Sequence, residues 1–191
     1  MSVENKGRPR ALRAWRLIAA LLLWAMAFDV LALREIKPGE PLRLDPDEGL
    51  VVISFETEIG VKNVRIERVG RVAAAPLLKD VPIGRTVALY AAKADRYRWV
   101  RVVYAQTEFW NLYYSVRNDK EFEFDVVAGK LNYAGDGVFG SDDNRNLYLH
   151  MANRSLRVID WLKATHPQVI AQYPLTYNGH FPDPFPAFYE E

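Results

Sequence analysis

The sequence contains no cysteine among its 191 residues. This absence excludes disulfide bonds, thiolate metal ligands, a cysteine nucleophile and the lipid-modified cysteine of a bacterial lipoprotein. Histidine is scarce as well: His150, His166 and His180 are the only three, and none has the spacing of a zinc motif such as H-E-x-x-H. The fold must therefore be held by packing and hydrogen bonding without cross-links.

Motifs for catalysis and for nucleotide binding are missing too. No serine stands in a G-x-S-x-G or S-x-x-K setting, and no glycine-rich loop leads into a helix with the Lys-Ser or Lys-Thr ending of a phosphate loop. We therefore expect a protein that is not an enzyme and that carries no cofactor.

A strong excess of one charge is also absent, because the formal net charge is +1. The first 16 residues hold five Lys and Arg and one acid, which leaves 20 basic and 23 acidic residues downstream. A weakly acidic remainder does not favour binding to nucleic acid.

An apolar segment near the N-terminus has the three parts of a secretory signal. Residues 1–16 are basic and polar, Leu17 to Phe28 is an unbroken apolar run, and Ala25-Met26-Ala27 has an A-x-A spacing. We expect residues 1–27 to be a signal peptide cleaved after Ala27, or an uncleaved membrane anchor whose transmembrane helix continues to Leu33. An ordinary buried helix is the third alternative. Cleavage predicts a periplasmic protein, and an anchor predicts one attached to the inner membrane and facing the periplasm.

The rest of the chain has the composition of one globular domain. Half of all residues are hydrophobic and 13% are aromatic, which is enough to bury one core. Residues 28–48, with several prolines and charges, are expected to form a linker. Residues 49–191 are expected to form a single domain.

Short β-branched and aromatic runs separated by turn residues dominate this domain. Gly49 to Phe55 is apolar on both faces, which is typical of a central strand. Gly135-Asp136-Gly137 is one of the expected turns. The pattern predicts a mostly β fold, an antiparallel β-sandwich of about seven or eight strands. The expected strands are Gly49–Phe55, Val61–Val69, Thr86–Ala91, Tyr97–Ala105, Glu108–Ser115, Glu121–Val127, Lys130–Ala134 and Asn146–Met151.

One amphipathic helix is expected near the C-terminus, over residues 153–165, with Asn153 as its N-cap. Its apolar arc should pack on a sheet. His166 follows the helix, where a cation interacts favourably with the helix dipole. The tail, residues 167–191, alternates prolines with aromatic residues and is expected to be extended along the domain surface.

An acidic loop is the only candidate metal site. Asp142, Asn144 and Asn146 match the first three alternating positions of an EF-hand calcium loop. Leu147 replaces the required glycine, and Asn153 replaces the bidentate glutamate. A solvated turn is the alternative, and we expect no bound metal.

Aromatic residues provide the candidate binding surface, because such rings stack on sugars or bury part of a partner protein. The alternative is that they fill the interior of the sandwich. The candidate residues are Trp99, Trp110, Tyr113, Tyr177, Phe181 and Phe185.

The segment from Glu121 to Asp136, EFEFDVVAGKLNYAGD, resembles a strand-turn-strand of uncharacterised bacterial envelope proteins with carboxypeptidase-regulatory-like or immunoglobulin-like sandwiches. The resemblance implies a fold and a compartment and no activity. Together these features predict an exported, non-catalytic cell-envelope protein that binds another envelope protein. The alternatives are a glycan or cell-wall binding module and an enzyme of unrecognised type. Contact with the membrane is expected only through an uncleaved N-terminal segment.

Overall fold

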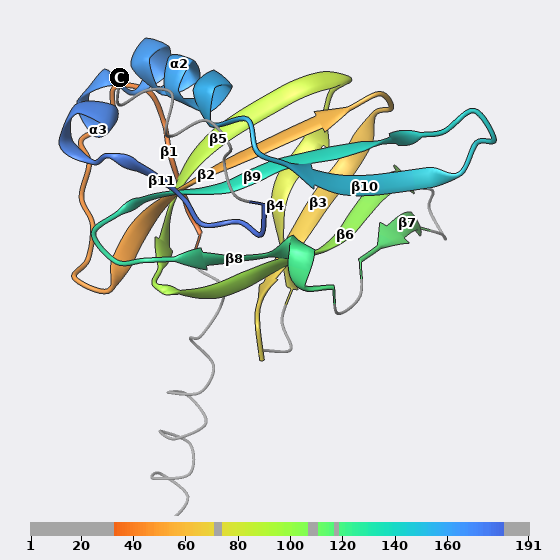
Figure 1. The fold of residues 1–191 in the computed structure, drawn as a ribbon, viewed down its shortest axis with the longest axis horizontal. Helices are drawn as coiled ribbons and strands as arrows, with labels where there is room; N and C mark the ends of the chain where they lie inside the picture. The colour runs from red at the N-terminus through yellow and green to blue at the C-terminus, as the bar shows by residue number, and fades with distance from the viewer. Residues whose placement is uncertain (1–32, 71–73, 107–110, 117–118, 182–191) are drawn as a thin grey trace, which may run out of the picture. The chain divides into compact units, whose positions relative to one another are not determined.

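The structure, a computed structural model, describes residues 33–70, 74–106, 111–116 and 119–181. These residues form two sheets (Figure 1). Sheet A has the spatial order β1 (Arg34–Ile36), β5 (Gly84–Lys93), β2 (Glu48–Thr57), β9 (Leu131–Ser141) and β10 (Leu147–Ala152), and β11 (Leu175–Tyr177) also pairs with β9. Sheet B has the order β4 (Ala74–Val81), β3 (Val61–Arg68), β6 (Asp95–Gln106) and β7 (Asn111–Ser115), and β8 (Glu123–Val126) also pairs with β6.

Strand β2 lies in the middle of sheet A, as its apolar sequence predicts. It pairs with β5 on one side and with β9 on the other. Ile53 and Phe55 point into the core shared with sheet B, whereas Leu50 and Val52 point to the opposite face. Because both faces are covered, a strand of this kind shows little alternation between apolar and polar residues.

The main core lies between the two sheets and is rich in aromatic side chains. Trp99 on β6 stacks on Phe55 with 6.1 Å between ring centroids, and Phe139 stacks on the same ring at 6.4 Å. The ring of Phe55 packs directly on the backbone of Gly137, where a Cβ atom would lie 3.0 Å from the ring. A larger residue than glycine would therefore crowd the core at this position. Aromatic burial on this scale supplies much of the stability that cross-links do not provide.

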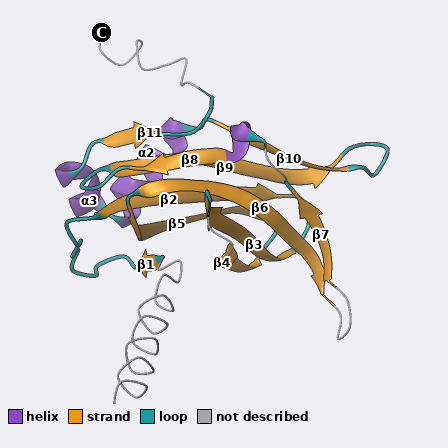
Figure 2. Cartoon of the chain, turned by 90° about the horizontal axis from the view of Figure 1, so that it is seen from below, coloured by secondary structure: helices purple, strands orange, loops and turns teal. Residues whose placement is uncertain are grey.

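Two helices cover the outer face of sheet A. They are α2 (Ser155–Thr165) and α3 (Pro167–Gln172), which gather at one end of the domain (Figure 2). Val158, Leu162 and Val169 bury their side chains in a second apolar cluster with strands of sheet A. The expected packing of the helix on a sheet is confirmed.

The region after α2 differs from the expected extended tail. Pro167 begins α3, where its fixed φ and missing N–H suit the first helical position. Leu175–Tyr177 then form β11, parallel to β9. Residues 182–191 lie outside the described residues. The N-cap of α2 is Arg154, while Asn153 accepts hydrogen bonds through Oδ1 from the backbone N–H (3.2 Å) and hydroxyl (2.7 Å) of Ser155.

The mostly β prediction is confirmed, and the two packed sheets are compatible with a β-sandwich. The wholly antiparallel prediction is wrong, because β9 runs parallel to β2 and to β11. The described residues contain eleven strands, more than expected, and the strands β1, β4 and β11 were not predicted. Strand β1 falls within residues 28–48, where a linker was expected.

The turn expected at Gly135-Asp136-Gly137 is instead part of β9. Gly135 has φ +90°, and the pairing with β2 shifts at this point, so the strand bulges rather than ends. The neighbouring strand-turn-strand is also not a hairpin. Strand β8 pairs with β6 in sheet B, whereas β9 belongs to sheet A. The turn between them therefore crosses from one sheet to the other.

The expected signal peptide or anchor, residues 1–27, lies outside the described residues. Among the residues that are described, no helix is long and apolar enough to cross a membrane.

Candidate functional site

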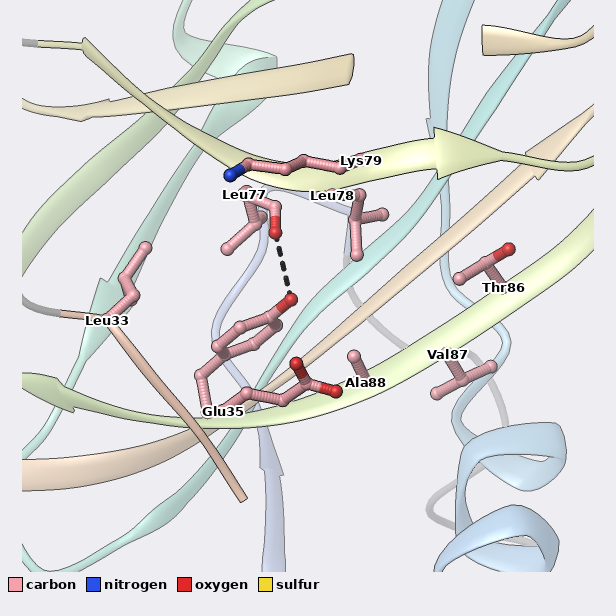
Figure 3. Close-up of a pocket in the computed structure, with 9 residues that line it drawn as sticks. Leu33, Glu35, Leu77, Leu78, Lys79, Thr86, Val87 and Ala88 are labelled. Carbon is pink, nitrogen blue, oxygen red and sulfur yellow. Dashed lines mark hydrogen bonds between the residues drawn. The ribbon is translucent and has the colours of Figure 1, made fainter. Parts of the chain in front are cut away.

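A pocket of about 460 Å³ opens where the edges of the two sheets meet (Figure 3). We call it the seam pocket. One wall comes from Leu77, Leu78 and Lys79 on β4 of sheet B. The other comes from β1, the residue just before it, and β5 of sheet A. The residues on this second wall are Leu33, Glu35, Thr86, Val87, Ala88 and Tyr90.

The seam is open because each bordering strand has a free edge. Strand β4 pairs with β3 and with no other strand in the described part of the chain. Strand β1 covers only Leu89 to Ala91 of β5, although β5 begins at Gly84. Unpaired strand edges are sites where a further strand can add.

The inner part of the seam pocket is apolar. The buried side chains of Leu77 and Leu78 line one wall of the pocket, and Ala88 and Tyr90 line the facing wall. The Tyr90 hydroxyl donates a hydrogen bond to the Leu77 carbonyl oxygen at 2.9 Å, which links β5 to β4 across the seam (Figure 3). Burial, with a smaller contribution from the charge of Glu35, raises the pKa of Tyr90 above its ordinary value. The phenol therefore stays protonated and acts as a donor.

Charged groups lie only at the rim of this pocket. Glu35 and Lys79 are exposed residues on opposite walls. The lining contains no histidine and no serine. The lining therefore combines leucine and alanine side chains with polar groups, and both kinds occur in binding pockets.

A buried polar cluster lies on the other face of sheet A, near the start of α2. We call it the Asp136 cluster, and its members are Ser54, Glu56, Arg85, Tyr133, Asp136 and Arg154.

Asp136 is the centre of this cluster and is wholly buried. The Tyr133 hydroxyl donates to its Oδ1 at 2.5 Å, and Arg85 Nε lies 3.3 Å from its Oδ2. Arg154 Nη1 lies 3.8 Å from the same oxygen and also pairs with Glu56. Burial, and then the charge of Asp136, raise the pKa of Tyr133. Each carboxylate of the cluster thus lies beside at least one arginine, and each arginine lies beside at least one carboxylate.

The cluster attaches the start of α2 to the sheet. The backbone N–H of Arg154 donates to the Tyr133 hydroxyl at 3.2 Å, in addition to the contacts of its guanidinium. Arg85 also donates through Nε to the Ser54 hydroxyl oxygen at 3.0 Å. The carboxylate is enclosed by residues of the chain itself, and its Oδ2 faces the two guanidinium groups at ion-pair distance but accepts no hydrogen bond from the described residues.

The candidate calcium residues form a compact turn. Asp142 Oδ1 accepts from the backbone N–H of Asn144 at 2.9 Å and of Asn146 at 2.7 Å. The side-chain amide of Asn146 donates to Asp142 Oδ2 at 3.0 Å. These bonds lower the pKa of Asp142. Within the described ranges, no three acidic or histidine side chains gather as a metal site would require.

The candidate aromatic surface is divided between different places. Trp99 is 1% exposed and belongs to the core, so it does not lie on a surface. Tyr113, on β7 of sheet B, is 48% exposed, and its ring lies 4.1 Å from the guanidinium carbon of Arg101. Tyr177 packs against the ring of Tyr133 at 5.6 Å, and Phe181 is 39% exposed. Trp110 and Phe185 lie outside the described residues.

A second pocket, of about 340 Å³, lies beside the junction of α2 and α3. Its walls include Ile36, Leu42, Val169 and the buried His166. The ring of His166 lies 5.2 Å from that of Trp161. Burial lowers the pKa of His166, which disfavours the positively charged form expected at this helix end.

Sequence reasoning did not identify the residues of the seam pocket. Leu77 to Lys79 fall in a strand that was not predicted, and Glu35 falls in the expected linker. The available signal was the short apolar run Leu77-Leu78, which precedes a turn at Pro82. No protein-family model matches this chain, and neither the curated proteins nor the solved structures include a significant match to it.

Proposed function

We propose that this protein is an exported, non-catalytic binding module of the bacterial cell envelope and that it holds a partner protein at the seam pocket. The observation that carries the proposal is a pocket of about 460 Å³, with leucine and alanine side chains inside and polar groups at its rim, between two unpaired strand edges. Such a site suits an apolar side chain of a partner while the partner's backbone lies along the edge. The exposed Ile83, in the turn joining β4 to β5, adds apolar surface at the end of the same seam.

Export is the second part of the proposal and rests on the basic and apolar sequence of residues 1–27. Intact-mass analysis of the protein recovered from soluble periplasm and from membranes tests it. A mass beginning at Phe28 in the soluble fraction supports a cleaved signal peptide, and a full-length mass in membranes supports an anchor. Full-length protein in the cytoplasmic fraction contradicts export.

The fold resemblance is also part of the proposal. Two sheets around a shared core support a sandwich like those of carboxypeptidase-regulatory-like or immunoglobulin-like envelope proteins. The parallel pairs of β9 depart from the antiparallel arrangement of the immunoglobulin fold. The resemblance therefore bears on architecture and compartment only.

Site-specific photocrosslinking tests the binding proposal. A photoreactive amino acid replaces Lys79 or Thr86 at the seam, and the matched control replaces Lys163 on the exposed face of α2. Full-length protein is expressed in the bacterial envelope and irradiated. We expect one protein adduct of the same mass from both seam positions and none from the control. Adducts that are equally abundant at all three positions contradict the proposal.

Glycan binding is the second candidate, and the exposed Tyr113 ring beside Arg101 favours it. Aromatic rings accompanied by polar groups can stack on sugars. Titration with soluble muropeptides tests it through tryptophan fluorescence and through loss of binding in Tyr113→Ala. Unchanged fluorescence at saturating muropeptide would count against it.

A further inference from the structure

The free part of β5 is bordered directly by the seam pocket. Strand β5 pairs with β2 along its whole length, but β1 covers only Leu89 to Ala91 on the other side. Residues Gly84 to Ala88 therefore have no strand partner on that side among the described residues. A sheet edge of this length is long enough for a short added strand, since strands of 3–10 residues are usual.

The pocket reaches the backbone of this edge. Thr86, Val87 and Ala88 all line it, although successive side chains on a strand point to opposite faces. The wall that β5 provides therefore includes its backbone edge as well as side chains (Figure 3). On β4 the pairing shifts at Leu77, so Leu77 and Leu78 both belong to the core between the sheets, and the side chains themselves form that wall.

Strand β1 shows how an added strand would be oriented. It runs antiparallel to β5, and Glu35 lies opposite Tyr90. Glu35 lines the seam pocket, whereas its neighbour Ile36 joins the apolar cluster beneath the helices. A segment continuing the line of β1 would place alternate residues opposite Ala88 and Thr86, and these residues would point into the seam pocket. The chain itself turns away after β1, where Glu40 N–H bonds to the Lys37 carbonyl at 3.1 Å.

The charge of Glu35 selects the first residue of such a segment. Glu35 lies at the β1 end of the pocket, and Lys79 lies on the opposite wall. The carboxylate of Glu35 favours a cationic side chain near β1, because opposite charges across an interface fix its register. Between the ends, the leucine and alanine walls favour valine, isoleucine or leucine.

We propose that the seam takes an extended segment of a partner protein as an additional strand of sheet A, antiparallel to Gly84–Ala88. Alternate apolar side chains of this segment fill the pocket, and a lysine or arginine lies beside Glu35. The inference rests on the proposed function, because it specifies how the partner is held. It distinguishes backbone pairing from simple insertion of a side chain.

Binding of synthetic peptides to the full-length protein tests the inference. The probes are fluorescein-labelled peptides of eight residues that begin with lysine, alternate valine, isoleucine or leucine with threonine, and end with glutamate. A matched set carries N-methyl groups on alternate backbone nitrogens, which keeps the side chains and removes strand hydrogen bonds. We expect binding by fluorescence anisotropy that weakens about tenfold or more on N-methylation, because backbone bonds supply affinity in strand addition.

Variants and hydrogen exchange locate the binding. Ile83→Gln, at a side chain that is 70% exposed, should weaken binding severalfold, whereas Leu156→Gln on α2, 44% exposed, should leave it unchanged. Glu35→Lys should reverse the preference for peptides with lysine over those with glutamate at the first position. Those amides of Gly84 to Ala88 that point away from β2 should exchange more slowly when the peptide is bound.

The outcomes separate this inference from the function on which it rests. If the N-methylated peptides bind as tightly as the unmodified ones, and Ile83→Gln still weakens that binding, strand addition is overturned. The proposed function as a binding module then still stands. If no peptide of either set binds, and the crosslinking experiment gives no adduct specific to the seam, both strand addition and the proposed function are overturned. Exchange at the same amides of Gly84 to Ala88 can also be measured without peptide at several protein concentrations. If it slows as the protein concentration rises, a second copy of this chain fills the seam, and the assignment to a partner protein is overturned.

Discussion

The hydroxyl group of Tyr133 donates a hydrogen bond to Asp136 at 2.5 Å, and neither side chain is exposed to solvent. Residues three apart in a regular strand point to opposite faces of the sheet. Here Val52 pairs with Tyr133 and Ser54 with Asp136, so β9 contains one extra residue at this place. The bulge, with Gly135 at φ +90°, turns Asp136 to the face of Tyr133.

Replacement of Asp136 should therefore destabilise the domain. Asp136→Asn removes the buried charge that faces two partly exposed guanidinium groups, those of Arg85 and of Arg154, and Arg154 keeps its pairing with Glu56. The expected loss in the free energy of unfolding is about 3 kcal/mol, measured by urea denaturation. Asp125→Asn is the matched control, because Asp125 pairs with Arg96 at the surface and should cost less than about 1 kcal/mol. Equal losses in the two variants would show that the buried cluster has no special role.

Gly49, at the start of β2, should not tolerate a side chain. A Cβ atom at this position would lie 2.2 Å from the carbonyl oxygen of Val127, in the turn that crosses between the sheets. Gly49→Ala must displace backbone, so we expect a loss of about 3 kcal/mol or more in unfolding free energy. Gly60→Ala is the control, because no atom lies within 4 Å of a Cβ there and it should change stability little. A Gly49→Ala protein as stable as the control would mean that this turn moves freely.

The sequence predicted those parts of the fold in which side-chain pattern and pairing agree. Strand β2 is covered on both faces, and its unbroken apolar run indicated this. Helix α2 was found within two residues of its start, because its apolar arc and Asn153 mark it. Strand β1 was missed, since Arg34-Glu35-Ile36 is too short and too charged to stand out, and its pairing with distant β5 holds it.

The candidate site was harder to predict because it depends on contacts between distant residues. The seam pocket joins Glu35 and Lys79, which belong to different sheets and are 44 positions apart in the sequence. The Asp136 cluster depends on a bulge, and Gly-Asp-Gly is also a usual turn sequence. Trp99 shows the converse difficulty, because an aromatic residue in a strand has the same local pattern whether it lies in the core or on the surface.

Stability should depend on pH through His166. Its pKa in the folded protein lies below the ordinary value of 6.5, because burial disfavours the charged ring. As the pH falls below 6.5, the unfolded chain binds a proton at this position before the folded chain does, so the free energy of unfolding decreases. Between pH 7.5 and pH 5.5, urea denaturation should show a smaller decrease for His166→Gln than for the wild type. His150→Gln, at an exposed position on β10, should keep the wild-type decrease; an unchanged slope in His166→Gln contradicts the prediction.

The seam pocket should lose its shape when the bond across it is removed. Tyr90→Phe deletes the hydroxyl that donates to the Leu77 carbonyl oxygen and leaves that oxygen without this donor. We expect a loss of about 1 kcal/mol in unfolding free energy. Faster hydrogen exchange at the amides of Leu77 to Lys79 should accompany it, because β4 has no second strand partner among the described residues. Tyr113→Phe, at a half-exposed ring on sheet B, is the control and should change neither quantity. Unchanged exchange in Tyr90→Phe would mean that the walls of the pocket are held by the leucine packing alone.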